Sequence, residues 1–261
     1  MGLTTAQTPL RRRWEVFRTL TAAEIKEERD LTATGLLRWV IEPLSYMFVY
    51  MILLGAILNR PRPNYPIFLL AALIPFRFFT ESLFRAMAVL KSQSTILTNR
   101  IFPREVLPLV VVASNAATLV LSLVLLVPFM VALDIPFHLS LLWVPVVLAI
   151  LLILTAGPTY MAALIGLYFP DFRGSVQNLV RMSFFLSTGL FTLRDVPGQE
   201  LPLLIQANPL SSVFDSFRAA IIQGRTPDRV DLLYPLALGL FLLAVGLFLY
   251  RWRQDQFAKE V

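Results

Sequence analysis

Few residues of this chain have the side-chain chemistry that an enzyme active site needs. The sequence contains one histidine, His138, and it has no cysteine, no HExxH motif and no paired aspartate motif. No glycine is followed by lysine, so the chain lacks the P-loop pattern that would bind ATP. A single histidine in a loop is usually a surface residue. We therefore expect no catalytic residue, no metal site and no cofactor site in this chain.

Three charged residues stand out because they lie within an apolar stretch: Arg77, Glu81 and Arg85. Their spacing of four places them on one face of a helix. Charges inside a membrane span are costly and face protein or water. One interpretation is a ladder of ion pairs that satisfies itself. The other is that Arg77 faces a path for an anionic substrate, such as a lipid-linked pyrophosphate.

Aromatic residues are the second group that could act on a substrate, since the chain has 20 Phe, 7 Tyr and 4 Trp. Aromatic faces stack on the apolar faces of sugars without a fixed hydrogen-bond pattern, which would suit a sliding glycan. The alternative is that these residues face lipid or the protein core. The candidate channel-lining residues are Tyr46, Tyr50, Phe76, Arg77, Glu81, Phe184 and Phe185.

The elements that must position these residues are apolar segments long enough to span a bilayer. Hydrophobic residues make up 57% of the chain and charged residues only 15%, whereas soluble domains carry about 25% charged residues. Since a helical span needs roughly 20 apolar residues, the sequence predicts an all-α integral membrane protein with six transmembrane helices. These are residues 39–58, 66–87, 107–133, 139–168, 176–193 and 232–250.

The distribution of basic residues predicts the orientation of these spans. With the N-terminus placed inside, 16 of the 23 Lys and Arg residues lie on the inner side and six on the outer side, with Arg77 in a span. Membrane proteins collect Lys and Arg on the cytoplasmic side. We therefore expect both termini in the cytoplasm, and we attribute the net charge of +6 to topology and not to nucleic-acid binding.

Two further segments are amphipathic and too polar to be spans. Residues 14–30 predict an N-terminal interface helix on the membrane surface, with a solvated helix packed on the protein as the alternative. Residues 199–224 predict a re-entrant helical hairpin between the fifth and sixth spans, with a surface helix as the alternative. In that hairpin Asn208 is a strong N-cap, Pro209 suits the first helical position and Gly224 is a plausible stop.

Three strings then carry a resemblance to a known family. They are Gly35-Leu36-Leu37-Arg38-Trp39-Val40-Ile41-Glu42-Pro43-Leu44, then Asn99-Arg100-Ile101-Phe102-Pro103-Arg104-Glu105-Val106-Leu107-Pro108-Leu109, and Asn208-Pro209-Leu210 with Arg218. Together with the order of segments, they resemble the ABC-2-type permease subunits of bacterial polysaccharide exporters, which export O-antigen, capsule or teichoic acid. The resemblance covers nearly the whole chain, and the middle string is the most specific.

The resemblance implies a homodimer that works with two copies of a separate ABC ATPase, which would bind ATP and magnesium. Residues 89–100 would form the coupling helix that docks on the ATPase, and the outer hairpin would gate the exit. The expected coupling residues are Lys91, Ser94, Thr95, Asn99 and Arg100. The expected gate residues are Asn208, Pro209, Phe214 and Arg218.

The sequence therefore predicts a permease, not an enzyme, in the bacterial cytoplasmic membrane. It would export a lipid-linked polysaccharide such as an O-antigen and would bind no nucleic acid. Two alternatives remain: an ABC-2 exporter of drugs or small lipids, and a membrane glycosyltransferase or lipid-processing enzyme. The last would need acidic or histidine clusters at the interface, and none is apparent.

Overall fold

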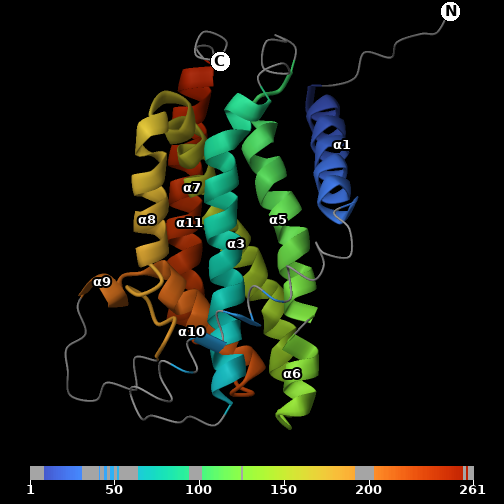
Figure 1. Cartoon of the computed structure of the whole chain (residues 1–261), viewed down its shortest axis with the longest axis vertical. Coiled ribbons are helices and arrows are strands. Elements are labelled where there is room, and N and C mark those ends of the chain that lie inside the picture. The colour runs from blue at the N-terminus through green and yellow to red at the C-terminus, as the bar shows by residue number, and fades with distance from the viewer. Residues whose placement is uncertain are drawn as a thin grey trace, which may run out of the picture.

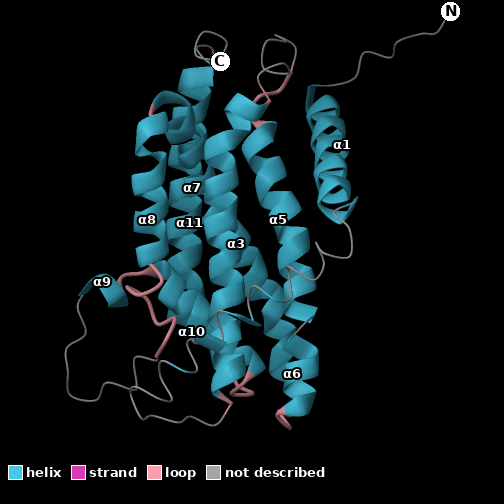
Figure 2. Cartoon of the chain, in the orientation of Figure 1, coloured by secondary structure: helices cyan, strands magenta, loops and turns pink. Residues whose placement is uncertain are grey.

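The computed structural model describes residues 9–30, 64–93, 102–124, 126–191 and 203–254, together with positions 41, 44, 45, 48, 49, 52 and 257. Every regular element in these residues is helical (Figure 2). In chain order they are α1 (Pro9–Asp30), α3 (Tyr65–Ser92), α5 (Val106–Val124), α6 (Leu126–Ala132), η2 (Leu139–Trp143), α7 (Val144–Tyr168), η3 (Pro170–Phe172), α8 (Arg173–Met182), α9 (Leu203–Gln206), α10 (Pro209–Ile221) and α11 (Arg229–Arg253).

Four helical stretches among the described residues are long and apolar enough to cross a membrane. They are Tyr65–Ser92, Val106–Ala132, Leu139–Tyr168 and Arg229–Arg253. They correspond to the predicted second, third, fourth and sixth spans, and the fourth has the predicted ends. The all-helical class is therefore confirmed. The predicted first span, residues 39–58, lies largely outside the described residues, so the total of six spans stays a prediction.

The prediction of a continuous fifth span over residues 176–193 is wrong. Helix α8 ends at Met182, and residues 183–189 form successive turns. Hydroxyl groups satisfy part of this backbone: Ser183 Oγ donates to the carbonyl of Val180 (2.6 Å), and Ser187 Oγ donates to that of Phe184 (2.6 Å). Serine side chains that bond to nearby backbone in this way compete with helix formation.

The long helices stand side by side as a bundle, with α3 in contact with both α5 and α7 (Figure 1). We call the end where α3 and α11 finish and α5 begins the basic end. Glycines let the backbones approach closely. A Cβ on Gly157 of α7 would collide with the backbone of Leu242 in α11, and one on Gly166 would collide with the carbonyl of Met87 in α3. Only glycine fits such contacts between helices.

The buried side chains form two clusters along the bundle. One lies toward the basic end and joins α3, α5, α7 and α11 through residues such as Leu90, Tyr160 and Tyr250. The other lies toward the opposite end and joins α3, α7 and α10 through residues such as Ile67 and Phe217. Each half of the bundle therefore has its own core, and the two candidate sites described below are built on these cores.

Helix α1 packs against α5, and it runs close to the direction of the bundle axis (Figure 1). Trp14 is 61% exposed and stacks on Phe17 with ring centroids 5.5 Å apart. A helix packed on the protein is the alternative that the sequence left open for this segment. Its placement on a membrane surface stays a prediction.

Candidate functional site

Helix α10 begins as its sequence predicts. The side chain of Asn208 accepts a hydrogen bond from the backbone N–H of Leu210 (3.0 Å), and Pro209 occupies the first helical turn. The amide of Asn208 also donates to the carbonyls of Ser183 (3.2 Å) and Leu186 (2.9 Å). The N-cap prediction is confirmed, and the same residue fastens α10 to the turns that follow α8.

The other end of α10 is closed by Gly224, which adopts a left-handed backbone with φ of 63°. The helix itself ends at Ile221, three residues earlier. A Cβ on Gly224 would collide with the ring of His138, which is an exposed loop residue as expected. Ser140 Oγ donates to the carbonyl of Ala220 (2.8 Å), so η2, which precedes α7, also holds the end of α10.

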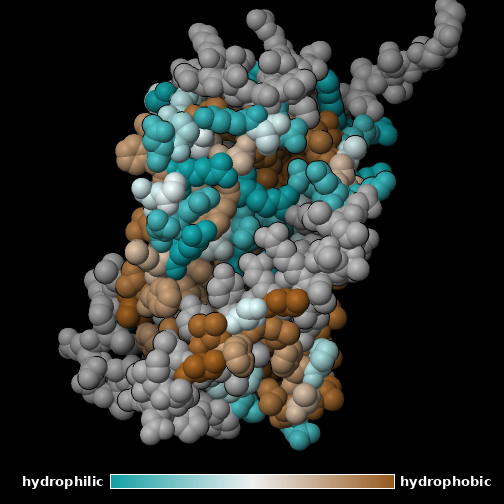
Figure 3. All heavy atoms as spheres, viewed as in Figure 1, coloured by the Kyte–Doolittle hydropathy of each residue, from teal (hydrophilic) through white to brown (hydrophobic). Residues whose placement is uncertain are grey.

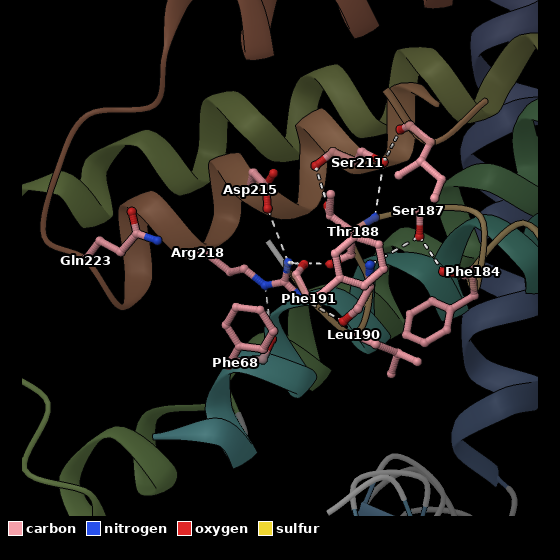
Figure 4. A network of polar contacts seen from close by, with 12 residues as sticks. Phe68, Phe184, Ser187, Thr188, Leu190, Phe191, Ser211, Asp215, Arg218 and Gln223 are labelled. Carbon is pink, nitrogen blue, oxygen red and sulfur yellow. Dashed lines mark hydrogen bonds and ion pairs between the residues drawn. The ribbon is translucent and has the colours of Figure 1, made fainter. Parts of the chain in front are cut away.

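Arg218 is the central residue of this region, and its side chain is fully buried. The sequence pattern places Arg218 off the apolar face of α10, yet the fold covers both faces. Its guanidinium donates to the carbonyls of Phe68 (3.3 Å) and Gly189 (2.7 Å), and it also donates to Asp215 Oδ1 (3.2 Å) (Figure 4). It further donates to the carbonyl oxygens of Thr188 and Phe191.

These contacts tie Arg218 to the backbone of the turns that follow α8. The carbonyls of Thr188, Gly189 and Phe191 all accept hydrogen bonds from Arg218. The ring of Phe68 also lies against the guanidinium, 3.6 Å from its centroid to the central carbon. A cation over an aromatic face is stabilised, more so when water is excluded. Arg218 thus joins α10, the start of α3 and the turns after α8.

Three of the predicted site aromatics meet beside this network. The ring of Phe76 lies 4.8 Å from that of Phe184 and 6.5 Å from that of Phe214, measured between centroids. Phe184 and Phe214 are buried and Phe76 is partly buried. Phe185, in contrast, is 56% exposed. The structure therefore brings a predicted channel residue of α3 against a predicted gate residue of α10, within the packed core.

A second network lies at the basic end and centres on Glu105, which is the residue before α5. Its carboxylate pairs with Arg13 of α1 (2.9 Å) and with Arg251 of α11 (2.7 Å). The backbone carbonyl of Glu105 accepts a hydrogen bond from the hydroxyl of Tyr160 in α7 (2.8 Å). The hydroxyl of Tyr250 in α11 donates to the neighbouring carbonyl of Arg104 (2.9 Å). Four helices thus meet at this one turn of backbone.

The charged face of α3 lies between the two networks. Arg77 and Glu81 are half-buried. Arg85 donates to Asn115 Oδ1 of α5 (2.6 Å) and pairs with Glu24 of α1, so it has partners on two other helices. Asn115 in turn donates to Ser82 Oγ (3.1 Å), and both of these side chains are buried. The roles predicted for Arg77 and Glu81 stay predictions.

Hydrophilic side chains gather over α3 and α8 on the half of the surface nearer the basic end, whereas the other half is more apolar (Figure 3). On α8, Asn178 and Arg181 are exposed, and the guanidinium of Arg181 lies 5.3 Å from the ring centroid of Phe84 on α3. An exposed polar stripe within a membrane bundle needs water or protein opposite it.

Most of the expected coupling residues and two of the channel candidates lie outside the described residues. Of the expected coupling residues, Lys91 is exposed in the last turn of α3. Ser94, Thr95, Asn99 and Arg100 lie outside the described residues. The channel candidates Tyr46 and Tyr50 lie outside them as well. Among the described residues, no group of three or more His, Cys, Asp or Glu side chains is arranged to hold a metal ion.

Sequence patterns alone assign no role to Glu105, Tyr160, Tyr250 or Glu24. One signal was present, because Arg104 and Glu105 stand in the string that carries most of the family resemblance. The two tyrosines gave a weaker signal. Each is a polar group in an apolar helix, and a buried hydroxyl needs a hydrogen-bond partner. The partners are backbone carbonyls of a distant segment, which no local pattern reveals.

Known proteins similar to this chain are polysaccharide export permeases. The O-antigen export system permease protein RfbA of Myxococcus xanthus is 29% identical over 247 residues, which cover 93% of this chain and 94% of the relative. RfbA of Klebsiella pneumoniae is 24% identical over 242 residues, 92% of each chain. The polysialic acid transport protein KpsM of Escherichia coli is 27% identical over 242 residues, 89% of this chain and 91% of the relative. No protein-family model matches the chain.

Proposed function

We propose that this chain, which resembles ABC-2-type polysaccharide export permeases over about nine tenths of its length, is the membrane permease of a polysaccharide exporter. The observation that carries this function is the full-length similarity to three proteins named for O-antigen export or polysialic acid transport. The relatives are named as permease or transport proteins, so the chain is a transport subunit and not an enzyme. The family resemblance predicted from the three sequence strings is thereby confirmed.

The substrate we propose is a lipid-linked polysaccharide, moved from the cytoplasmic face of the inner membrane to its outer face. The exposed polar residues of α8 and the half-buried charged residues of α3 support a hydrophilic path beside the bundle. Arg77 would face the anionic lipid-linked end of the substrate. The aromatic residues Phe185, Tyr46 and Tyr50 would contact the glycan, whereas Phe76 and Phe184 would support the path from the core.

The assembly we propose is a homodimer of this chain with two copies of an ABC ATPase, which binds ATP and magnesium. Residues 89–100 would dock on that ATPase, so the basic end of the bundle would face the cytoplasm. The start of α1 and the end of α11 both lie at the basic end (Figure 1). This supports placing both chain termini on the cytoplasmic side, in keeping with the positive-inside distribution.

At the opposite end, α9 and α10 would form the outer re-entrant hairpin that gates the exit. Helix α10 has only 13 residues, too few to span a bilayer, yet it is buried against α3, α7 and α11. A short helix at membrane depth is tolerated where protein surrounds it. The Arg218 contacts support a gate whose resting position is fixed through α3 and the turns after α8.

Co-purification tests whether this chain works with a separate ATPase subunit. An affinity-tagged permease, extracted in mild detergent from its native cell, should retain a P-loop ATPase at one copy per permease. Mass spectrometry of the purified complex would identify that subunit. Isolation of the chain without any ATPase, from membranes in which the ATPase gene is expressed, would count against the exporter and favour a separate membrane enzyme.

A further inference from the structure

Helix α1 is fastened to the bundle at two points along its length. Near its start, Arg13 pairs with Glu105 at the beginning of α5 (2.9 Å). Near its end, Glu24 pairs with Arg85 of α3. The two anchoring residues of α1 are eleven positions apart, which is about 16 Å along a helix at 1.5 Å per residue. Helix α1 therefore connects two separate helices of the bundle.

Glu105 and Arg85, the bundle residues that α1 binds, each have a second partner within the bundle. The second carboxylate oxygen of Glu105 accepts a hydrogen bond from Arg251 of α11 (2.7 Å). The second terminal nitrogen of Arg85 is held by Asn115, which is buried and anchored by Ser82. The side chains of Arg85 and Glu24 are 29% and 26% exposed, and in the other pair Glu105 is 13% and Arg13 47% exposed. Partly buried pairs within a network are screened less than isolated surface pairs, which contribute little.

A cavity of about 440 Å³ lies between α1, α3 and α5 beside the second attachment point. Glu24, Glu27, Arg85 and Ser92 are among the residues that line it. Leu20 of α1 packs against the buried cluster near the basic end, whereas Glu24 and Glu27, further along α1, border this space. The Glu24–Arg85 pair joins α1 to α3 beside this space. We expect its loss to loosen the second half of α1, while the first half stays attached through Arg13.

The two attachment points lie on either side of the proposed coupling segment in the sequence. Arg85 stands in α3, which leads into residues 89–100, and Glu105 stands five residues after that segment. We infer that α1 acts as a brace that makes the end of α3, the start of α5 and the end of α11 move together when the ATPase acts. Glu24, Arg85 and Glu105 are then positioning residues for energy coupling. This inference rests on the proposed function.

The test is a charge exchange in the full complex of permease and ATPase, reconstituted into proteoliposomes with a lipid-linked glycan. The variants are Glu24→Gln, Arg85→Glu and the double variant Glu24→Arg with Arg85→Glu. The exchange is feasible because the side-chain amide of Asn115 can rotate by half a turn. Its NH₂ group would then donate to the carboxylate introduced by Arg85→Glu, and its oxygen would accept from the hydroxyl of Ser82. The matched control is Arg11→Gln, since Arg11 is 68% exposed and pairs with Glu15 within α1 (3.3 Å).

Each single variant should keep the ATPase bound and hydrolysing ATP, but glycan export per ATP should fall at least about fivefold, the lower end of typical coupling between linked sites. The exchange variant should recover export per ATP to within about twofold of the original protein. The control Arg11→Gln should export as much glycan per ATP as the original protein. Single variants that export as well as the original protein, or an exchange variant no better than the single ones, would overturn the brace. Failure of the unchanged complex to move glycan would instead refute the proposed function.

A second measurement tests the brace without any transport. In the purified complex, trypsin should cut within α1 at least about threefold faster in Glu24→Gln than in the original protein, because local opening exposes the chain. Equal cutting rates would mean that the pair does not hold α1, and the inference would fail even if export were impaired.

Discussion

Replacing Arg218 by alanine should be the most damaging single change in the half of the bundle opposite the basic end. Its guanidinium is fully buried and donates to four carbonyl oxygens and to the carboxylate of Asp215. Breaking a buried ion pair by removing one partner costs about 3–5 kcal/mol, because the remaining charge is left unpaired. The unpaired carbonyls would add to this cost, since each buried acceptor without a partner costs about 1–3 kcal/mol.

The assay is thermal unfolding of the detergent-purified permease. At about 2–4 °C per kcal/mol for a chain of this size, Arg218→Ala should lower the melting temperature by roughly 10 °C or more. Arg218→Lys should recover only part of this loss, because an ammonium group has three donors and cannot reproduce the planar fork of a guanidinium. The double variant Arg218→Ala with Asp215→Ala should lower the melting temperature by less than the sum of the two single decreases, because no unpaired carboxylate remains.

The control is Arg225→Ala. Arg225 pairs with Asp228 (3.3 Å), but both side chains are exposed, at 36% and 62%, and such a pair contributes about 0–1 kcal/mol. The control should therefore change the melting temperature by no more than about 3 °C. An Arg218→Ala variant that unfolds within 3 °C of the original protein would refute the claim that this guanidinium holds α10, the start of α3 and the turns after α8 together.

Three further predictions follow from other parts of the bundle. Arg77→Gln should lower glycan export with little loss of assembled complex, and an unchanged export rate would refute a role in the substrate path. Gly166→Val should prevent accumulation of folded protein because the backbone of Met87 occupies the space, whereas Gly174→Val, with no atom nearby, should accumulate normally; immunoblots of membranes distinguish the two. Asn208→Ala removes the cap of α10 and its two bonds to the preceding turns, so it should lower the free energy of unfolding by about 1–2 kcal/mol in denaturant titrations.

The features that depend on local sequence were predicted well. The candidate span Leu139–Tyr168 has the predicted ends, and its long apolar run stands out in the sequence because it exceeds the roughly 20 residues that a span needs. The start of α10 at Asn208 and Pro209 followed from the chemistry of helix caps. The class of protein followed from the low share of charged residues and from three short strings. Each of these signals is contained within a single segment.

The features that depend on contacts between distant segments were missed. Residues 183–191 are apolar enough to read as helix, but their carbonyls bind Arg218, which lies about 30 residues later in the chain. Glu105 gave no sign that Arg13 and Arg251 would both reach it. The burial of Arg218 could not be read from α10 alone either, because the covering residues come from α3 and from the turns after α8.

ATP-dependent transport by the reconstituted complex is the property that a permease of a glycan exporter must have. Proteoliposomes that contain the permease and its ATPase would be loaded with a lipid-linked glycan on the ATPase side, and the glycan reaching the other face would be measured with and without ATP. We expect glycan on the far face only with ATP and only when both subunits are present. Equal appearance without ATP, or with the ATPase absent, would contradict it.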